Sequence, residues 1–246
     1  MPSIYLSPSL QPYNEYAGGG NEQEYMNRIA DEMEPYLKAN GIVWDRNTIG
    51  TNVGAAIRES NSGYYDLHLA LHSNAGPESL AGKIQGTDVY YYPESQNGRQ
   101  AADILAENFK TVYPEPEKVK TLPTRSLAEV VKTNAPAVLM EVAYHDNPED
   151  AQWIRSHTEE IAKNIVKGLT QYFGLPFIDA IEPERIGIVA TQATPLNIRE
   201  YPSRQAPVIG QAPKGAEVAV LGMWEDWYVI RYGDHIGYAA REYIRA

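Results

Sequence analysis

Short apolar runs alternate with helical patterns through the first ~175 residues of the chain. The apolar runs predict strands, and apolar positions recurring every three or four residues predict helices between them. The predicted strands are 4–6, 42–44, 66–71, 87–92 and 137–142, and the predicted helices are 22–39, 53–60, 100–111, 127–132 and 148–173. This alternation is typical of an α/β fold, with a mostly parallel sheet and helices on both faces.

The pattern changes after residue 173. A stretch with two prolines and no helical stripe, "FGLPFIDAIEPER", is followed by short strand-like runs separated by turn signals, such as "LNIR", "EVAVLGMW" and "WYVIRYG". Such spacing is typical of a small all-β barrel. We therefore predict a first domain over residues 1–176, a linker over 177–185 and a barrel over 186–246.

Composition narrows the chemistry. The chain has no cysteine, so disulfides, thiolate metal sites and a cysteine nucleophile are excluded. The net charge is −11 and lies almost entirely before the linker, which argues against nucleic acid as a partner. No apolar run approaches the ~18–20 residues of a membrane span, and the N-terminus lacks the pattern of a signal peptide. We expect a monomer.

Three polar residues stand where strands end or a helix begins. His72 closes the apolar run "DLHLAL", and Glu141 lies near the end of "APAVLMEV". Ligands of open α/β sheets bind beyond the carboxyl ends of the strands. Glu22 lies one helical turn before Met26, on the apolar stripe of its helix, so its carboxylate faces inward. Each residue by itself also fits a structural role, as a satisfied core polar group or a helix cap.

Together these residues indicate a metal site. Catalytic zinc takes about three protein ligands and leaves a position for water, and a nearby carboxylate can then move the proton of that water. In a chain without cysteine, histidine and glutamate are the natural zinc ligands.

The stretches "YDLHLALHSNA" and "PAVLMEVAYHDNPED", with the helix that begins at Glu22, resemble the zinc-dependent N-acetylmuramoyl-L-alanine amidases over roughly residues 4–174. The resemblance implies cleavage of the amide bond between muramic acid and L-alanine in peptidoglycan. It implies Glu22 and His72 as zinc ligands and Glu141 as the catalytic carboxylate.

The chain departs from this family at the first motif. The family has Asp-Pro-Gly-His-Gly-Gly after its first strand, and that histidine binds zinc; here the stretch reads "SPSLQP". Gln11 occupies the position that matches the histidine of the family motif, and Asn14 could orient its amide. His145 offers an imidazole, which is the stronger donor to zinc. We prefer Gln11 as the third ligand and keep His145 as the alternative. His68 is expected in the core or behind the ligands, since it lies about 13 Å from His72 along the strand.

The C-terminal part resembles a bacterial Src-homology-3-like barrel, through "LNIREYPS", "VIGQAPKGAEVAVLG" and "WYVIRYGDHIGYAAREYI". The resemblance implies attachment to the cell wall. The aromatic residues that could form its binding face are Trp224, Trp227, Tyr228 and Tyr232.

These observations favour a peptidoglycan amidase with a wall-binding barrel that works outside the cell or in the cell wall, as a mature form or after release by lysis. Two alternatives stay open. In the first, the absence of the histidine of the first family motif has abolished zinc binding, and the protein binds peptidoglycan without cleaving it. In the second, the zinc site cleaves the stem peptide.

Overall fold

The structure is a computed structural model that describes residues 1–181 and 183–246. It divides into two compact units. Residues 3–33 and 44–172 form one, here the α/β unit; residues 1–2, 34–43 and 173–246, apart from residue 182, form the other, here the barrel unit. Residue 182 of the predicted linker lies outside the described residues.

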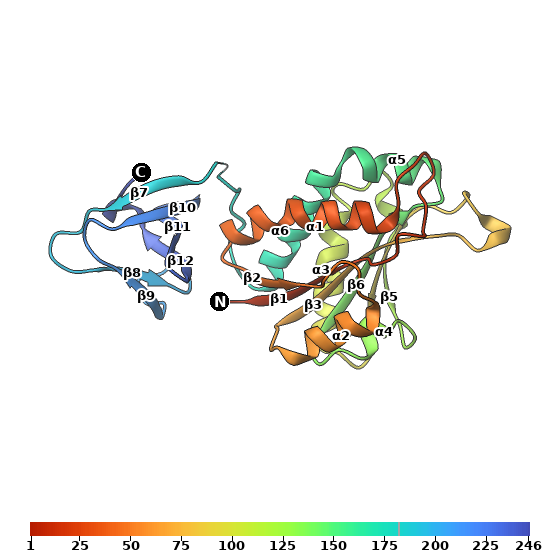
Figure 1. Ribbon diagram of the computed structural model, residues 1–246, viewed down its shortest axis with the longest axis horizontal. Coiled ribbons are helices and arrows are strands. Elements are labelled where there is room, and N and C mark those ends of the chain that lie inside the picture. Colours follow the sequence, from red (N-terminus) through yellow and green to blue (C-terminus); the bar gives the residue numbers. More distant parts are fainter. Residues whose placement is uncertain (182) are drawn as a thin grey trace. The chain divides into compact units, whose positions relative to one another are not determined.

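A six-stranded sheet runs through the first part of the chain in the order β2-β1-β3-β6-β4-β5 (Figure 1). The strands are β1 (Ser3–Pro8), β2 (Val43–Arg46), β3 (Leu67–Asn74), β4 (Thr87–Tyr91), β5 (Val119–Pro123) and β6 (Ala137–Tyr144). β3 lies between β1 and β6 and is parallel to both. The carboxyl end of β3 therefore has a parallel neighbour on each side.

Helices cover both faces of this sheet, as predicted. They are α1 (Glu22–Ala39), α2 (Val53–Ser62), α3 (Gln96–Phe109), α4 (Ala128–Val131), α5 (Pro148–Ser156) and α6 (Thr158–Tyr172). In Figure 1, α2 and α4 lie below the sheet, and α1, α5 and α6 lie above it. The apolar stripe of α1 is fully buried at Met26, Ile29 and Met33, which fixes the direction in which the start of the helix faces.

Three local expectations differ from the structure. The single helix predicted over 148–173 is two helices, because the backbone of His157 leaves the helical region at φ −131°. β3 does not stop before His72 but continues to Asn74, with a register shift after His72. β5 was not predicted, because its five residues include a lysine and a proline. β4 is antiparallel to β6, and the sheet is mostly parallel, as predicted.

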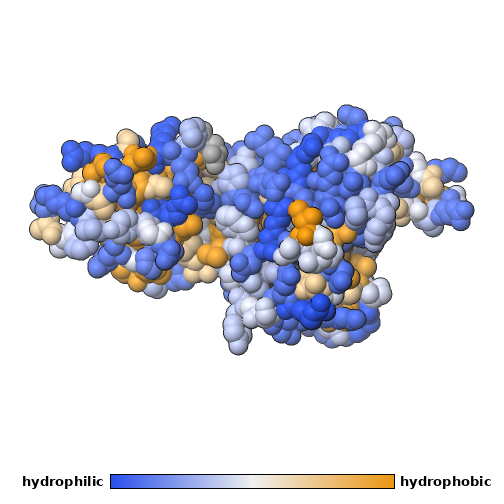
Figure 2. All heavy atoms as spheres, viewed as in Figure 1, coloured by the Kyte–Doolittle hydropathy of each residue, from blue (hydrophilic) through white to orange (hydrophobic). Residues whose placement is uncertain are grey.

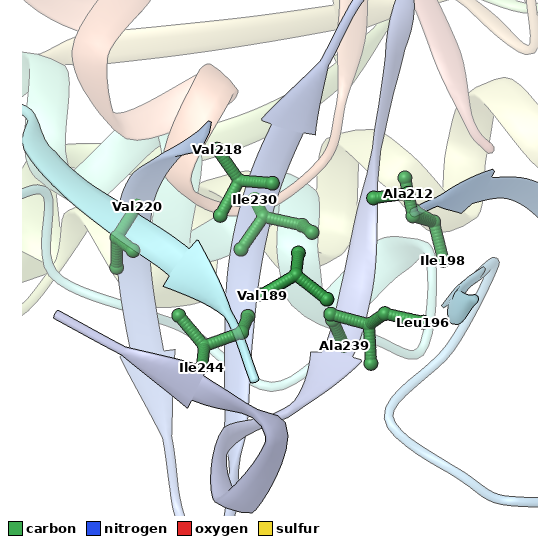
Figure 3. Close-up of a cluster of buried hydrophobic side chains, with 9 residues drawn as sticks. All are labelled: Val189, Leu196, Ile198, Ala212, Val218, Val220, Ile230, Ala239 and Ile244. Atoms are coloured by element: carbon green, nitrogen blue, oxygen red, sulfur yellow. The ribbon is translucent and has the colours of Figure 1, made fainter. Parts of the chain in front are cut away.

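The barrel unit contains a seven-stranded antiparallel sheet in the order β13-β7-β10-β11-β12-β8-β9. Its strands are β7 (Arg185–Val189), β8 (Leu196–Arg199), β9 (Val208–Ala212), β10 (Glu217–Trp224), β11 (Trp227–Tyr232), β12 (His235–Ala240) and β13 (Ile244–Arg245). The strands β8 to β12 were predicted from the sequence, whereas β7 and β13 were not. One buried cluster of this unit is aliphatic, as Figure 3 shows for Val189, Ile198 and Ile230 among others, and a second contains the buried Tyr238.

A membrane-spanning helix is not found in the described part of the chain, since none of its helices is both long and apolar enough.

Candidate active site

His72 is placed near the carboxyl end of β3, in the middle of the sheet. Its position pairs with Glu141 on the parallel neighbour β6. Side chains at paired positions on neighbouring strands point to the same face of a sheet. The strands β3 and β6 are otherwise apolar and buried, so they hold both residues on a rigid support.

Glu22 reaches His72 from the first residue of α1. The helix begins there because the side chain of Asn21 accepts a hydrogen bond from the backbone N–H of Glu24 at 2.9 Å, which caps the first turn. The Glu22 side chain is only 1% exposed and its Oε1 lies 2.8 Å from His72 Nδ1. The predicted inward direction of Glu22 is therefore what the structure has.

Gln11 joins the same pair from the loop after β1. Its Nε2 lies 3.2 Å from His72 Nδ1 and 3.5 Å from Glu22 Oε1. Asn14 donates to Gln11 Oε1 at 3.4 Å and to Glu22 Oε2 at 2.5 Å, so it touches both residues. The amide oxygen of Gln11 points toward Asn14, and the amide must turn for that oxygen to face Glu22 and His72. The oxygen and nitrogen of an amide are assigned from such contacts.

Glu129 is a part of this cluster that the sequence analysis missed. It lies on α4, is 6% exposed at its side chain, and places Oε2 3.1 Å from His72 Nε2. Its other oxygen lies 3.3 Å from Nε2 of the fully buried His68. The available signal was weak: a glutamate between Leu127 and Val130, two apolar residues that pack inward.

Glu141 has a half-buried side chain whose carboxylate has an incomplete set of partners. Its Oε2 is inaccessible and makes no hydrogen bond to any described residue. Burial, opposed by the charge of His72 and aided by the charges of Glu22 and Asp88, raises the pKa of Glu141 to about 7. Asp88 occupies the paired position on β4. A carboxyl group with a pKa near 7 can both accept and donate a proton at neutral pH.

His145 is turned toward the backbone. Its Nδ1 lies 2.8 Å from the carbonyl oxygen of Ser73, and its ring stacks on Tyr16 at 5.6 Å. His68 lies in the core and behind His72, as expected, with Nδ1 2.9 Å from Ser60 Oγ. Of the two candidates for a third ligand, Gln11 is the one with a described contact to both Glu22 and His72.

Carboxylates dominate the electrostatics of the cluster. Burial by itself lowers the pKa of His72, but its hydrogen bonds to Glu129 and Glu22 outweigh burial and hold that pKa well above the ordinary value. Burial raises the pKa of Glu129, and the bonds to His68 and His72 more than reverse this effect. Glu22 likewise has a lowered pKa, because its bonds to His72 and Asn14 outweigh its burial. The cluster thus carries more negative than positive charge and favours a bound cation.

The donor set fits a zinc ion with one carboxylate ligand and two neutral ligands, an imidazole and an amide. Glu22, His72 Nδ1 and Gln11 converge on one point and provide oxygen and nitrogen donors that zinc accepts. Among the described residues, no group of three histidine, cysteine, aspartate or glutamate side chains is placed to hold a metal.

A cavity of about 390 Å³ opens beside the cluster. His72 and Glu129 line it together with the polar residues Tyr13, Asn47 and Asn52. The carbonyl oxygen of the buried Asn47 side chain has no hydrogen-bond partner among the described residues. The cavity therefore offers uncharged polar atoms next to the candidate catalytic groups.

The four aromatic residues predicted for the barrel are placed differently from one another. Trp227 lines two neighbouring cavities of about 590 and 730 Å³, and Tyr228 lines the second. Trp224 packs against the buried cluster that contains Leu221, and Tyr232 packs against the aliphatic core. The structure thus brings only Trp227 and Tyr228 to a common cavity.

Comparison with known proteins agrees with this geometry. Residues 12–171 match the family model described as N-acetylmuramoyl-L-alanine amidase, and residues 194–245 match that of the bacterial SH3 domain. The first match covers more than half of the chain, so the chain belongs to the N-acetylmuramoyl-L-alanine amidase family.

A curated relative is described as "Probable cell wall amidase LytH" of Staphylococcus aureus. It is 29% identical over 160 residues, which are 62% of this chain and 50% of the relative. The chain thus spans about half the length of the curated relatives it matches.

Solved structures share the fold of the α/β unit. The amidase AmiC2 of Nostoc punctiforme has a TM-score of 0.62 at 17% identity, over 70% of this chain and 97% of that one. The catalytic domain of the CD27L endolysin, described as targeting Clostridia difficile, has a TM-score of 0.58 at 23% identity, over 70% of this chain and 98% of that one. At these identities the likeness extends to the fold.

Proposed function

We propose that this protein is a zinc-dependent N-acetylmuramoyl-L-alanine amidase that hydrolyses the amide bond between muramic acid and L-alanine in peptidoglycan. The observation that carries the proposal is Glu141: its side chain is half-buried, one carboxylate oxygen is inaccessible and unpartnered, and its strand position pairs with that of His72, beside Glu22. A purely structural domain would gain nothing from three buried or half-buried carboxylates around one histidine, because each is costly to bury.

Glu22, His72 Nδ1 and Gln11 would hold the zinc, with His145 as the less favoured third donor. When bound, zinc would supply a Lewis acid that polarises the scissile carbonyl and makes the attacking water more acidic. Glu141 accepts the proton of that water and donates it to the leaving nitrogen of L-alanine. Its raised pKa suits both transfers, since a shuttle works best when its pKa lies near the working pH.

The cavity beside His72 supports a substrate with a neutral sugar-like part. Tyr13, Asn47 and Asn52 offer hydroxyl and amide groups, which form hydrogen bonds with hydroxyl and acetamido groups. We assign the muramic acid side of the bond to this cavity.

The barrel is proposed to hold the enzyme on the wall. Its two neighbouring cavities share Trp227 and Arg204, and an aromatic ring beside a guanidinium is a frequent centre of binding surfaces. We propose wall contact at Trp227 and Tyr228 and give Trp224 and Tyr232 a lesser part, because these two do not line either cavity. The working site of the protein is then the cell wall or the extracellular space.

Two measurements on the purified chain test the proposal. Mass spectrometry under native conditions should find about one zinc per chain after zinc is added back. Digestion of a defined muropeptide should release a stem peptide with a free L-alanine N-terminus and leave the saccharide intact.

Each contrary result points to a specific alternative. Zinc binding together with cleavage inside the stem peptide would make the protein a peptidase. No zinc and no cleavage, with wall binding retained, would make it a non-catalytic wall-binding protein.

A further inference from the structure

Glu129 is a buried carboxylate for which the proposed reaction has no use. It lies 57 residues from His72 in the sequence, on the four-residue helix α4, yet its side chain is 6% exposed and contacts the site. A buried carboxylate is retained only where its hydrogen bonds compensate its loss of hydration. Its partners therefore indicate its role.

Both oxygens of Glu129 are engaged. Oε1 accepts a hydrogen bond from Ser7 Oγ at 2.5 Å and lies 3.3 Å from His68 Nε2. Oε2 lies 3.1 Å from His72 Nε2. Ser7 accepts in turn from Asn47 at 3.2 Å. The carboxylate is thus held from one side and presents a fixed acceptor to the ring of His72.

The two nitrogens of His72 face different groups. Nδ1 faces Glu22 and Gln11, the proposed ligands, and Nε2 faces Glu129 alone among its described partners. We propose that Glu129 is a positioning residue: it accepts a hydrogen bond from Nε2–H of His72 and so keeps the Nδ1 lone pair directed at the metal position. This inference rests on the proposed function, since it concerns the same site.

A positioning residue contributes more to zinc affinity in this site than in a site with two histidine ligands. Gln11 offers a neutral oxygen, which donates less charge to zinc than an imidazole does. A carboxylate that accepts from the far N–H of a ligating histidine raises the basicity of that histidine, and outer-shell partners of this kind typically contribute 10–100-fold to metal affinity. Glu129 thereby offsets part of the loss at Gln11.

Zinc affinity of two variants tests this role. Glu129→Gln keeps the shape, but its single amide oxygen cannot accept from both the Ser7 side and the His72 side. Glu129→Leu removes both acceptors. Competition with a chromophoric chelator should show zinc binding weakened about 10-fold in the first and up to ~100-fold in the second.

Glu32→Gln is the matched control, because Glu32 is a half-buried carboxylate bonded to Thr158 at 2.9 Å and makes no described contact with the cluster. It should bind zinc as the unaltered protein does. Affinity within twofold of the unaltered protein for both Glu129 variants would overturn the proposal, whatever their thermal stability, because it would leave Glu129 a structural role only.

Nuclear magnetic resonance of the full-length, unaltered protein gives a test that needs no Glu129 variant to fold. In the zinc-loaded protein, the nitrogen shifts of His72 should show a protonated Nε2 and a metal-bound Nδ1; the reverse assignment would overturn the proposal. In the metal-free protein, a downfield proton of Nε2–H, assigned by its loss in His72→Gln, should mark the bond to Glu129. If no zinc binds at all, the proposed function fails, and the presence or absence of this proton still decides the inference.

Discussion

Both units of the molecule have an apolar core, but among the described residues the buried charged side chains lie in the α/β unit. In the α/β unit, the carboxyl ends of parallel strands bring Glu141 and His72 together, and α1 and α4 add Glu22 and Glu129. The core of the barrel unit contains aliphatic side chains and the buried Tyr238, and polar groups of this unit line cavities at the surface. In the face shown in Figure 2, hydrophilic residues cover most of the α/β unit, and hydrophobic residues are more frequent over the barrel.

This difference follows from the kind of group that each proposed role requires. Catalysis needs charged groups removed from water, since electrostatic interactions strengthen as water is excluded. A binding surface can use aromatic and polar groups that stay half exposed. We therefore expect substitutions in the α/β cluster to change catalytic activity strongly and to raise or lower the free energy of unfolding. Substitutions in the barrel cavities should change only the affinity for the wall.

The largest effect is expected at Glu141. Glu141→Gln keeps the size of the side chain and removes the proton acceptor, so turnover of a soluble muropeptide should fall by about 10²–10⁴-fold. Zinc content, measured on the same sample, should persist, because Glu141 is not among the proposed ligands. Parental turnover in this variant would make Glu141 a structural residue and would remove the proposed mechanism.

A smaller effect is expected at the third zinc donor. Gln11→Ala should weaken zinc binding about 10-fold, and Gln11→His should preserve or strengthen it, because imidazole is the better donor. His145→Ala serves as the comparison and should keep its metal, since its Nδ1 is occupied by the Ser73 carbonyl. Metal loss in His145→Ala without loss in Gln11→Ala would exchange the two roles.

The buried charge also predicts a pH-dependent stability. The pKa of Glu141 is raised from 4.5 to about 7 in the metal-free fold, so the folded state binds more protons than the unfolded state between these values. Its contribution to the free energy of unfolding therefore falls as pH rises from 4.5 to 7 and is level above that range.

Replacing Glu141 by an uncharged residue should remove this fall in the free energy of unfolding between pH 4.5 and 7. Metal-free Glu141→Gln should be more stable than the unaltered protein by about 1–3 kcal/mol at pH 8, and by much less at pH 5. Urea unfolding at the two pH values measures the difference. A variant that is equally stable, or less stable, at pH 8 would show that Glu141 is not desolvated as its burial indicates.

The mildest effect is expected in the barrel. Trp227→Ala should weaken binding to intact walls about 10-fold, as loss of a central aromatic contact does at other interfaces. Tyr64→Ala is the control, because Tyr64 is a fully exposed aromatic residue of the α/β unit. Sedimentation with purified walls measures both. Equal loss in the two variants would indicate that wall binding does not distinguish the barrel from the rest of the surface.

Much of the site could be predicted from the amino-acid sequence, because the patterns that indicate its residues lie within single strands and helices. The apolar run around His72 predicts a buried strand, and the stripe of α1 directs Glu22 inward; both follow from the periodicity of strands and helices. The α/β class and the barrel follow in the same way from the spacing of apolar runs. The family resemblance then connected these residues with one chemistry.

The tertiary structure alone decided which distant groups meet. Glu129 lies on a helix too short to show a period, and its contact with His72 depends on how α4 packs below the sheet. The antiparallel direction of β4, which brings Asp88 beside Glu141, is likewise set by long-range pairing. Local sequence determines periodicity and burial, but the partner of a buried charge is chosen by packing between segments that the sequence does not place side by side.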